Sequence, residues 1–259
     1  MSAVFMAASC GGLKRASNVP PPAAQVKRFD FGCRMSSTDR GALASPMLQP
    51  MAPCPTVDVL HLDDVLIVVD KPAGVLAVPG RGEAGRDSLA ARVQAQFANA
   101  LVVHRLDMAT SGVMLFARGG LAQRQLSMAF ASGGVAKQYV AIVEGRLQGD
   151  SGVVDAPLAA DWPHRPRQVV DFERGKPSLT RWRVLERTTD STRLLLQPAT
   201  GRTHQLRVHL QWLGHPIRGD ALYAAAPLRA DRLLLHATRI ALAHPQTGSP
   251  CHFASDPRF

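Results

Sequence analysis

The stretch that decides the interpretation of this chain runs from Val102 to Arg118 and reads V-V-H-R-L-D-M-A-T-S-G-V-M-L-F-A-R. A short polar loop stands between two hydrophobic runs, and the second run, residues 112–117, predicts a buried strand. Asp107 lies in that loop between the cation of Arg105 and the hydroxyls of Thr110-Ser111. Asp and Ser/Thr side chains readily close turns by hydrogen bonding to the backbone. The loop is therefore either a capped turn with a structural role only, or a turn that fixes the Asp107 carboxylate in an exposed position.

Other segments extend the pattern along the chain. They are D-D-V-L-I-V-V-D-K-P-A-G at 63–74, K-Q-Y-V-A at 137–141, L-L-L-Q-P-A-T-G-R-T-H-Q-L-R-V-H-L at 194–210, and G-H-P-I at 214–217 followed by Gly219-Asp220 and Tyr223. In this order, from about Val65 to Phe253, the chain resembles the RluA family of RNA pseudouridine synthases. The segment D-W-P-H-R-P-R-Q at 161–168 is similar to the members with dual specificity for 23S rRNA and tRNA.

Hydrophobic periodicity outlines the elements independently of the family. We expect strands at 65–69, 112–117, 138–143, 179–185, 193–197, 233–235 and 240–243, and helices after Asp87-Ser88, at 121–132 and at 205–213. Neighbouring strands are close enough in sequence for hairpins, which favours an α+β fold over a parallel sheet. The resemblance implies the pseudouridine synthase fold, with a mixed, mostly antiparallel central sheet, flanking helices and a central RNA-binding cleft.

The family assigns the chemistry to a carboxylate, and by resemblance that residue is Asp107. A carboxylate suits a glycosidic carbon because it attacks directly or stabilises positive charge; an ester at C1′ and a glycal route both remain open. The resemblance implies that Tyr139 stacks on the uracil and that Arg202 pairs with Asp107. The alternatives are a core tyrosine at 139 and a phosphate contact at 202.

A uridine inside a stacked loop must be flipped out to reach Asp107. By resemblance Arg105 fills the vacated place, while His104 either helps or packs. Leu206 either walls the pocket or belongs to the core. Near Trp162 and Phe172, a cluster of basic residues suits phosphate contact and stacking, although a solvated hairpin is the alternative; its members are Arg165, Arg167, Arg174 and Lys176.

Composition agrees with an RNA partner. The formal charge is +10 and the sequence pI is about 10.3, so polyanions are natural partners. No run approaches the roughly 18 apolar residues of a membrane span. The isomerisation gains no atom and involves no redox step, so we expect no cofactor. His204 and His209 do not have the i, i+4 spacing of a helical metal pair, so we expect no metal site.

The four cysteines show no C-x-x-C spacing, which predicts reduced thiols and a cytoplasmic location. Residues 1–56 are Pro- and Ala-rich without periodicity, which predicts a disordered extension, an early start codon or, less simply, a transit peptide. Residues 57–259 then form the catalytic domain without an S4 domain. We expect a monomer that needs no protein partner.

Two other functions compete with this interpretation. A non-catalytic RNA-binding module would keep the basic surface without needing Asp107, Tyr139 and Arg202 together. A hydrolase would use Ser111 with His104 or His204, but Thr110-Ser111-Gly112 is not a G-x-S-x-G elbow. Within the family, an enzyme for a single rRNA or tRNA site is the remaining alternative.

Overall fold

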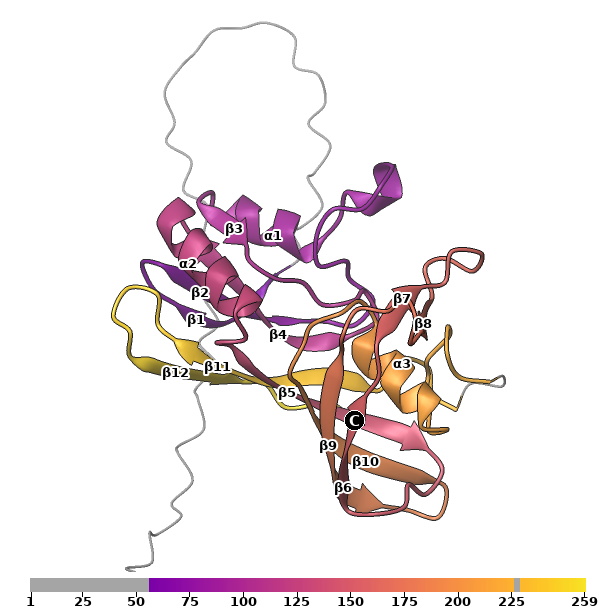
Figure 1. Ribbon diagram of the computed structural model, residues 1–259. Coiled ribbons are helices and arrows are strands. Elements are labelled where there is room, and N and C mark those ends of the chain that lie inside the picture. Colours follow the sequence, from indigo (N-terminus) through magenta and orange to yellow (C-terminus); the bar gives the residue numbers. More distant parts are fainter. Residues whose placement is uncertain (1–55, 226–228) are drawn as a thin grey trace, which may run out of the picture.

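The computed structural model describes residues 56–225 and 229–259, so the interpretation of residues 1–55, including three of the four cysteines, falls outside the described chain. Within the described residues, ten strands form one sheet in the order β1-β2-β4-β11-β5-β10-β9-β6, with β3 beside β4 and β12 beside β11 (Figure 1). Their bounds are β1 Asp58–Leu62, β2 Leu66–Lys71, β3 Ala100–Val102, β4 Ser111–Arg118, β5 Ala136–Glu144, β6 Ser151–Asp155, β9 Leu179–Arg187, β10 Ser191–Pro198, β11 Leu235–Ala243 and β12 Pro250–Ala254.

Three helices of the described residues pack on this sheet. The described part of the chain therefore has the α+β fold that the sequence predicted. They are α1 (Leu89–Gln96), α2 (Gly120–Ala131) and α3 (Gln205–Trp212), with a single 3-10 turn at η1 (Glu83–Gly85). The side chain of Ser88 caps α1 by accepting a hydrogen bond from the Ala91 N–H at 3.2 Å, as its position predicted. None of these helices combines the length and apolarity that crossing a membrane requires.

Strand β2 is buried on both faces because alternate side chains enter two different cores. Ile67 and Val69 pack with α1, whereas Leu66 and Val68 pack with α2. A strand has a period of two, so an uninterrupted apolar run fits this position between two layers. The continuous run at 65–69 therefore predicted the burial correctly.

The junction between β4 and β11 brings the 104–110 loop into the middle of the sheet. Among the described strand pairs it is the one parallel pairing, with Gly112 beside Ala237. Gly112 has φ +116°, and a Cβ atom there would lie 2.3 Å from the Ala237 carbonyl oxygen, so the close approach requires glycine. Ala237 in turn pairs with Tyr139 of β5, so the loop before β4, which carries Asp107, lies near Tyr139.

The second half of the sheet supports α3. Leu206 and Leu210 of α3 pack with Leu194 and Leu196 of β10 in a third core cluster. Beside α3 stands a separate hairpin formed by β7 (Leu158–Ala160) and β8 (Gln168–Val170). The long connection from β6 to β9 therefore becomes an ordered appendage next to α3.

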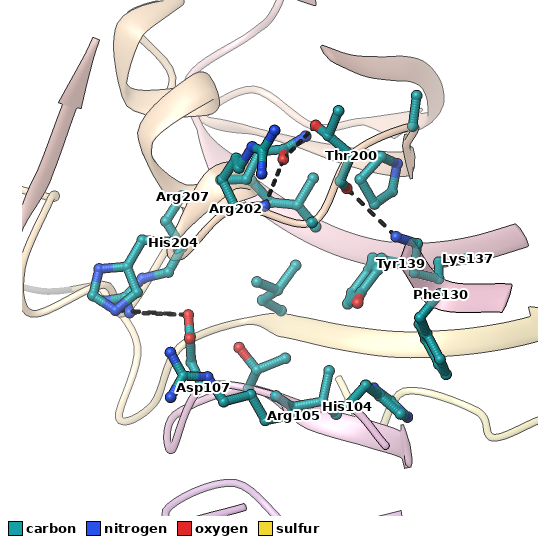
Figure 2. Close-up of a pocket in the computed structure, with 18 of the residues that line it drawn as sticks. His104, Arg105, Asp107, Phe130, Lys137, Tyr139, Thr200, Arg202, His204 and Arg207 are labelled. Carbon is teal, nitrogen blue, oxygen red and sulfur yellow. Dashed lines mark hydrogen bonds and ion pairs between the residues drawn. The ribbon is translucent and has the colours of Figure 1, made fainter. Parts of the chain in front are cut away.

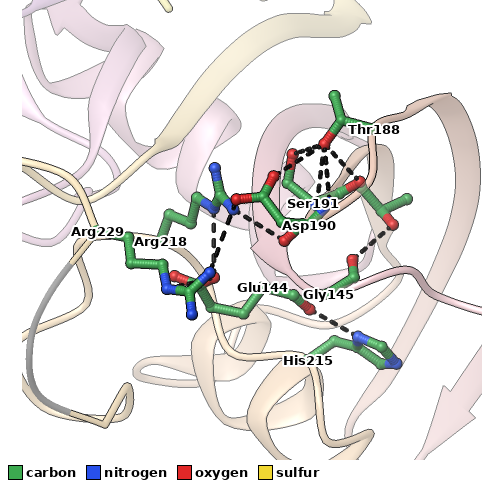
Figure 3. Close-up of polar contacts among 9 residues, drawn as sticks. Glu144, Gly145, Thr188, Asp190, Ser191, His215, Arg218 and Arg229 are labelled. Carbon is green, nitrogen blue, oxygen red and sulfur yellow. Dashed lines mark hydrogen bonds and ion pairs between the residues drawn. The ribbon is translucent and has the colours of Figure 1, made fainter.

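A network of ion pairs anchors the segment that follows α3 (Figure 3). Arg218 reaches Glu144 at 3.3 Å and Asp190 at 2.8 Å, and the His215 Nδ1–H donates to the Glu144 carbonyl at 2.7 Å. These contacts join the 214–220 segment to the end of β5 and to the turn between β9 and β10. The same segment carries Asp220 into the protein interior.

Two predictions about elements are wrong in detail. The stretches 233–235 and 240–243 do not form separate strands, because β11 runs continuously from Leu235 to Ala243 between β5, β4 and β12. Periodicity also missed the short or exposed strands β1, β3, β6, β7, β8 and β12. Their side chains are mostly half-exposed, so the apolar pattern is weak and pairing with neighbours defines them.

Candidate active site

A cavity of about 570 Å³ lies where the 104–110 loop, β5 and the loop before α3 meet (Figure 2). Four cationic side chains line it, namely Arg105, Lys137, Arg202 and Arg207, together with His104 and His204. Asp107 is the one carboxylate among the described residues that line it. The cavity thus combines a positive wall with a single acidic group, an arrangement that suits an anionic ligand reacting at one point.

The 104–110 loop is held from behind by a buried lysine. Lys71 is fully buried, and its ammonium donates to the carbonyls of Pro72 at 2.9 Å and Met108 at 3.0 Å. Burial lowers the pKa of Lys71 to about 8, although the charges of Asp107 and Asp70 oppose the shift. The K-P-x-G turn at the end of β2 therefore braces the loop that carries Asp107.

Two positively charged or chargeable groups approach the Asp107 carboxylate. Its Oδ2 atom lies 3.5 Å from Arg207 Nη1 and 3.8 Å from His204 Nε2. Arg207 also makes a bidentate pair with Asp220, at 2.7 and 2.8 Å, in which both side chains are buried. Burial lowers the pKa of Arg207, but the hydrogen bonds and charge of Asp220 more than compensate and raise it. Asp220 therefore holds Arg207 in place, and Arg207 faces Asp107 with a fixed positive charge.

The predicted pair between Arg202 and Asp107 is wrong in this structure. Arg202 lines the cavity with an exposed side chain whose Nε–H donates to the Pro177 carbonyl at 3.2 Å. Helix α3 begins only at Gln205, so Arg202 belongs to the loop, whereas Arg207 lies in the first turn, three residues after His204 and on the same face. The helix start expected at residue 205, combined with this i, i+3 spacing, was the signal that could have identified Arg207.

A buried glutamine organises the loop before α3. Gln205 Oε1 accepts hydrogen bonds from the Arg202 N–H at 3.0 Å and the Thr200 hydroxyl at 2.7 Å. Its Nε2 donates to the Leu179 carbonyl and the Thr180 hydroxyl, each at 3.0 Å. With its amide fully used, Gln205 fixes the backbone that shapes one wall of the cavity.

His209 serves the core and not the cavity. Its Nδ1 lies 2.9 Å from the Thr180 hydroxyl and its Nε2 lies 2.9 Å from the Ala156 carbonyl, and the ring is fully buried. Across the described residues no group of three His, Cys, Asp or Glu side chains has the arrangement of a metal site.

Tyr139 and Lys137 enter the cavity from β5 (Figure 2). Burial raises the pKa of Tyr139, and the charge of Asp107 raises it further, so the phenol stays protonated. The sequence analysis placed Lys137 in the K-x-Y motif but assigned it no role in the site. Its ammonium reaches the Thr200 carbonyl at 3.4 Å, and burial lowers its pKa. Alternation along the strand places residues 137 and 139 on the same face.

The predicted RNA-contacting residues of the cavity separate into distinct surroundings. Arg105 is exposed at the cavity and makes no hydrogen bond or ion pair within the described chain. His104 accepts the Leu115 N–H at its Nε2 and stacks on Phe130, with ring centroids 4.5 Å apart. Leu206 both lines the cavity and belongs to the third core cluster, so its two interpretations are compatible.

The basic residues of the β7–β8 region do not line the cavity. The Arg165 guanidinium lies 3.4 Å from the centre of the exposed Trp162 ring, and Lys176 is exposed. Arg167 lies 5.5 Å from the Tyr223 ring. These side chains form a surface beside the cavity, and a ligand would have to extend beyond the reaction centre to reach them.

The alternative hydrolase lacks its assigned dyad. The Ser111 hydroxyl is buried and lies 2.9 Å from Nδ1 of His236. Its histidine partner is therefore neither His104 nor His204. The described geometry therefore does not support Ser111 as a nucleophile with either base.

Comparison with known proteins agrees with this geometry. Residues 65–212 match the family model described as RNA pseudouridylate synthase. A protein of Yersinia pestis named dual-specificity RNA pseudouridine synthase RluA is 48% identical over 204 residues, covering 78% of this chain and 99% of that protein. A protein of the same name from Escherichia coli O6:H1 is 48% identical over 208 residues, covering 79% of this chain and 95% of that protein. Among solved structures, human RNA pseudouridylate synthase domain containing 1 has a TM-score of 0.68 at 26% identity, covering 82% of this chain and 88% of that one.

Proposed function

The chain belongs to the RNA pseudouridylate synthase family, whose members isomerise uridine to pseudouridine, and we propose that it modifies both 23S rRNA and tRNA. The catalytic part of this proposal rests on Asp107, the one carboxylate among the described residues that line the cationic cavity of about 570 Å³. The proteins named dual-specificity enzymes match it at 48% identity over nearly their whole length. The segment 161–168 supports the choice of 23S rRNA and tRNA through its resemblance to such enzymes.

We assign the reaction at C1′ to Asp107. Its carboxylate is partly exposed, and the nearest side-chain nitrogens, of Arg207 and His204, lie at 3.5 and 3.8 Å, so an oxygen is free to approach the sugar. Arg207, at 3.5 Å from the carboxylate, fixes its orientation. Tyr139 stays neutral and offers an aromatic face for the uracil while the base turns.

We assign RNA binding to the cationic side chains that line the cavity and to the adjacent β7–β8 hairpin. Arg105 has no partner within the described chain, so it is available to enter the stack when the uridine leaves it. Arg202 and Lys137 extend the positive wall towards the phosphates. Beyond the cavity, Trp162 with Arg165 over its ring provides an exposed stacking surface for unpaired bases.

The remaining predictions about cellular context follow the same interpretation. A compact catalytic domain covers a short stem-loop, such as an anticodon arm or one rRNA loop. We propose that it acts as a monomer in the cytoplasm without a cofactor or an obligatory protein partner.

The catalytic assignment is tested by Asp107→Asn. We expect tritium release from C5-labelled uridine RNA to fall below about a hundredth of the wild-type rate, because the variant loses the reacting group. RNA affinity should stay within a few-fold, because phosphate contacts dominate binding. Asp64→Asn is the matched control, since Asp64 is an exposed carboxylate outside the cavity. Substantial turnover by Asp107→Asn would overturn the assignment.

The substrate proposal is tested by mapping pseudouridine in total RNA from a deletion strain and by assaying isolated hairpins. We expect one site in 23S rRNA and one in tRNA to lose the modification, and both hairpins to react in vitro. Loss from only one RNA class would support the single-site alternative. Failure of every short hairpin, with intact rRNA reacting, would contradict recognition by a local stem-loop.

A further inference from the structure

His204 has a backbone conformation that calls for an explanation. It is the one residue other than glycine with positive φ in the described chain, at φ 55° and ψ 16°. Such a conformation is unfavourable for a residue other than glycine and persists where the surroundings impose it. His204 is also the N-cap of α3, yet its side chain does not cap the helix. The imidazole is instead directed into the cavity towards Asp107 (Figure 2).

A chain of hydrogen bonds behind the imidazole determines its tautomer. The Gln168 N–H donates to the Tyr223 hydroxyl oxygen at 2.8 Å, and the same hydroxyl lies 2.7 Å from His204 Nδ1. Tyr223 is 5% exposed, and a hydroxyl that only accepted these two bonds would leave its own proton without a partner. The Tyr223 O–H therefore donates to Nδ1, and the neutral ring carries its proton on Nε2.

The Nε2 proton faces the catalytic carboxylate. Nε2 lies 3.8 Å from Asp107 Oδ2, an approach that a small movement on substrate binding would shorten to a hydrogen bond. Burial lowers the pKa of His204, with the charge of Asp107 opposing the shift, so the ring is neutral near pH 7. Arg207 approaches the same Oδ2 atom at 3.5 Å, so the carboxylate is oriented from two sides.

Tyr223 joins this arrangement to the hairpin. Two guanidinium groups lie near its ring, that of Arg207 at 5.1 Å and that of Arg167 of the β7–β8 connection at 5.5 Å. The N–H group that donates to its hydroxyl belongs to Gln168, which is the first residue of β8. A displacement of the hairpin would therefore reach the imidazole through a single side chain.

We propose that His204 is a positioning residue for Asp107, held in its Nε2–H tautomer by Tyr223, and that the β7–β8 hairpin sets the position of the carboxylate through this relay. The inference rests on the proposed role of Asp107. It extends that role by linking the surface assigned to RNA binding with the reaction centre. RNA bound on the hairpin then stabilises the arrangement in which Asp107 is ready to react.

The test begins with Tyr223→Phe, which removes one hydroxyl and keeps the ring near the guanidiniums of Arg207 and Arg167. We expect kcat to fall by about tenfold to a hundredfold, because a small misplacement of a reacting group costs this much. KM and RNA affinity should change by less than about twofold, because phosphate contacts carry the binding. Loss of affinity with unchanged kcat, or wild-type kinetics, would overturn the relay.

A double-mutant cycle and a spectroscopic measurement complete the test. His204→Asn keeps a residue that tolerates left-handed backbone. In that background Tyr223→Phe should cause no further loss of kcat, whereas a full second loss would contradict the shared path. His252→Asn is the matched control, because His252 is an exposed residue of β12, and it should keep wild-type kinetics.

Imidazole ¹⁵N spectra of the wild-type protein test the tautomer without any activity measurement. The His204 signals, assigned by their loss in His204→Asn, should show Nε2–H in the wild type and a mixture of tautomers in Tyr223→Phe. A wild-type Nδ1–H tautomer would overturn the proposal even if Tyr223→Phe were too unstable for kinetics. Failure of the Asp107 assignment would appear separately, as turnover by Asp107→Asn.

Discussion

Replacement of Arg207 by methionine would separate its two roles, in stability and in the reaction. The guanidinium side chain is 6% exposed and pairs with Asp220, which is completely buried. Removing one partner of a buried pair leaves an uncompensated charge and typically costs about 3–5 kcal/mol. Since whole domains are stable by only about 5–15 kcal/mol, we expect a large fall in the urea midpoint of Arg207→Met.

The effect on the reaction follows from the 3.5 Å approach to Asp107. At an effective dielectric constant near 20, charges this close attract by roughly 5 kcal/mol. Solvent at the partly exposed Asp107 reduces this value, so we expect a loss of about 2–3 kcal/mol of transition-state stabilisation, or about a hundredfold in single-turnover rate.

The double variant Arg207→Met with Asp220→Asn distinguishes the two effects. Asparagine removes the buried charge and keeps an acceptor for the Leu222 and Tyr223 N–H groups, so much of the stability should return while turnover stays low. Arg202→Met is the comparison within the same motif and should cost less than tenfold in rate, since Arg202 contacts Pro177 instead of Asp107. A greater loss of turnover from Arg202→Met than from the double variant would refute the assignment of Arg207.

Three further changes test other parts of the site. Arg105→Ala should slow turnover on a structured hairpin more than on an unpaired strand, because less stacking opposes flipping in the latter; equal losses would assign Arg105 to another step. Gly112→Ala should lower the melting temperature strongly, because the new Cβ would lie 2.3 Å from the Ala237 carbonyl, and a wild-type melting curve would contradict this. Burial, aided by the charge of Lys137, lowers the pKa of His104 to about 3. As the pH falls, His104 therefore becomes protonated near pH 6.5 in the unfolded chain but only near pH 3 in the folded protein. The free energy of unfolding should then decrease as the pH is lowered from about 6.5 to about 3, and His104→Gln should reduce this decrease in urea titrations at different pH values.

Local patterns in the sequence were sufficient for the elements that carry strong periodicity. The apolar run at 65–69 predicted the buried strand β2, and Asp87-Ser88 predicted the start of α1. The ordered motifs identified the family and singled out Asp107 as the reactive carboxylate. The predictions of the elements and of the family succeed because side-chain burial, helix capping and motif order depend on residues that are close together in the chain, whereas the reactive role of Asp107 stays a prediction.

Only the tertiary structure decided which side chains meet Asp107. Arg202 and Arg207 are five residues apart in one motif, and the exact start of α3 together with buried Asp220 selects Arg207. The contact of His204 with Tyr223 likewise depends on a loop that returns nineteen residues later.

The sheet junction was equally inaccessible from local pattern. The parallel approach of β11 to β4 brings together segments separated by 125 residues, as the hydrogen bond between Ser111 and His236 shows. Distances between ionised groups depend on such long-range packing. Successive residues of an α-helix are rotated by about 100° about its axis, so a shift of one residue in the start of α3 would point a different side chain at Asp107. The sequence by itself therefore determined the family and the carboxylate that we propose to react, whereas packing determined which groups approach that carboxylate.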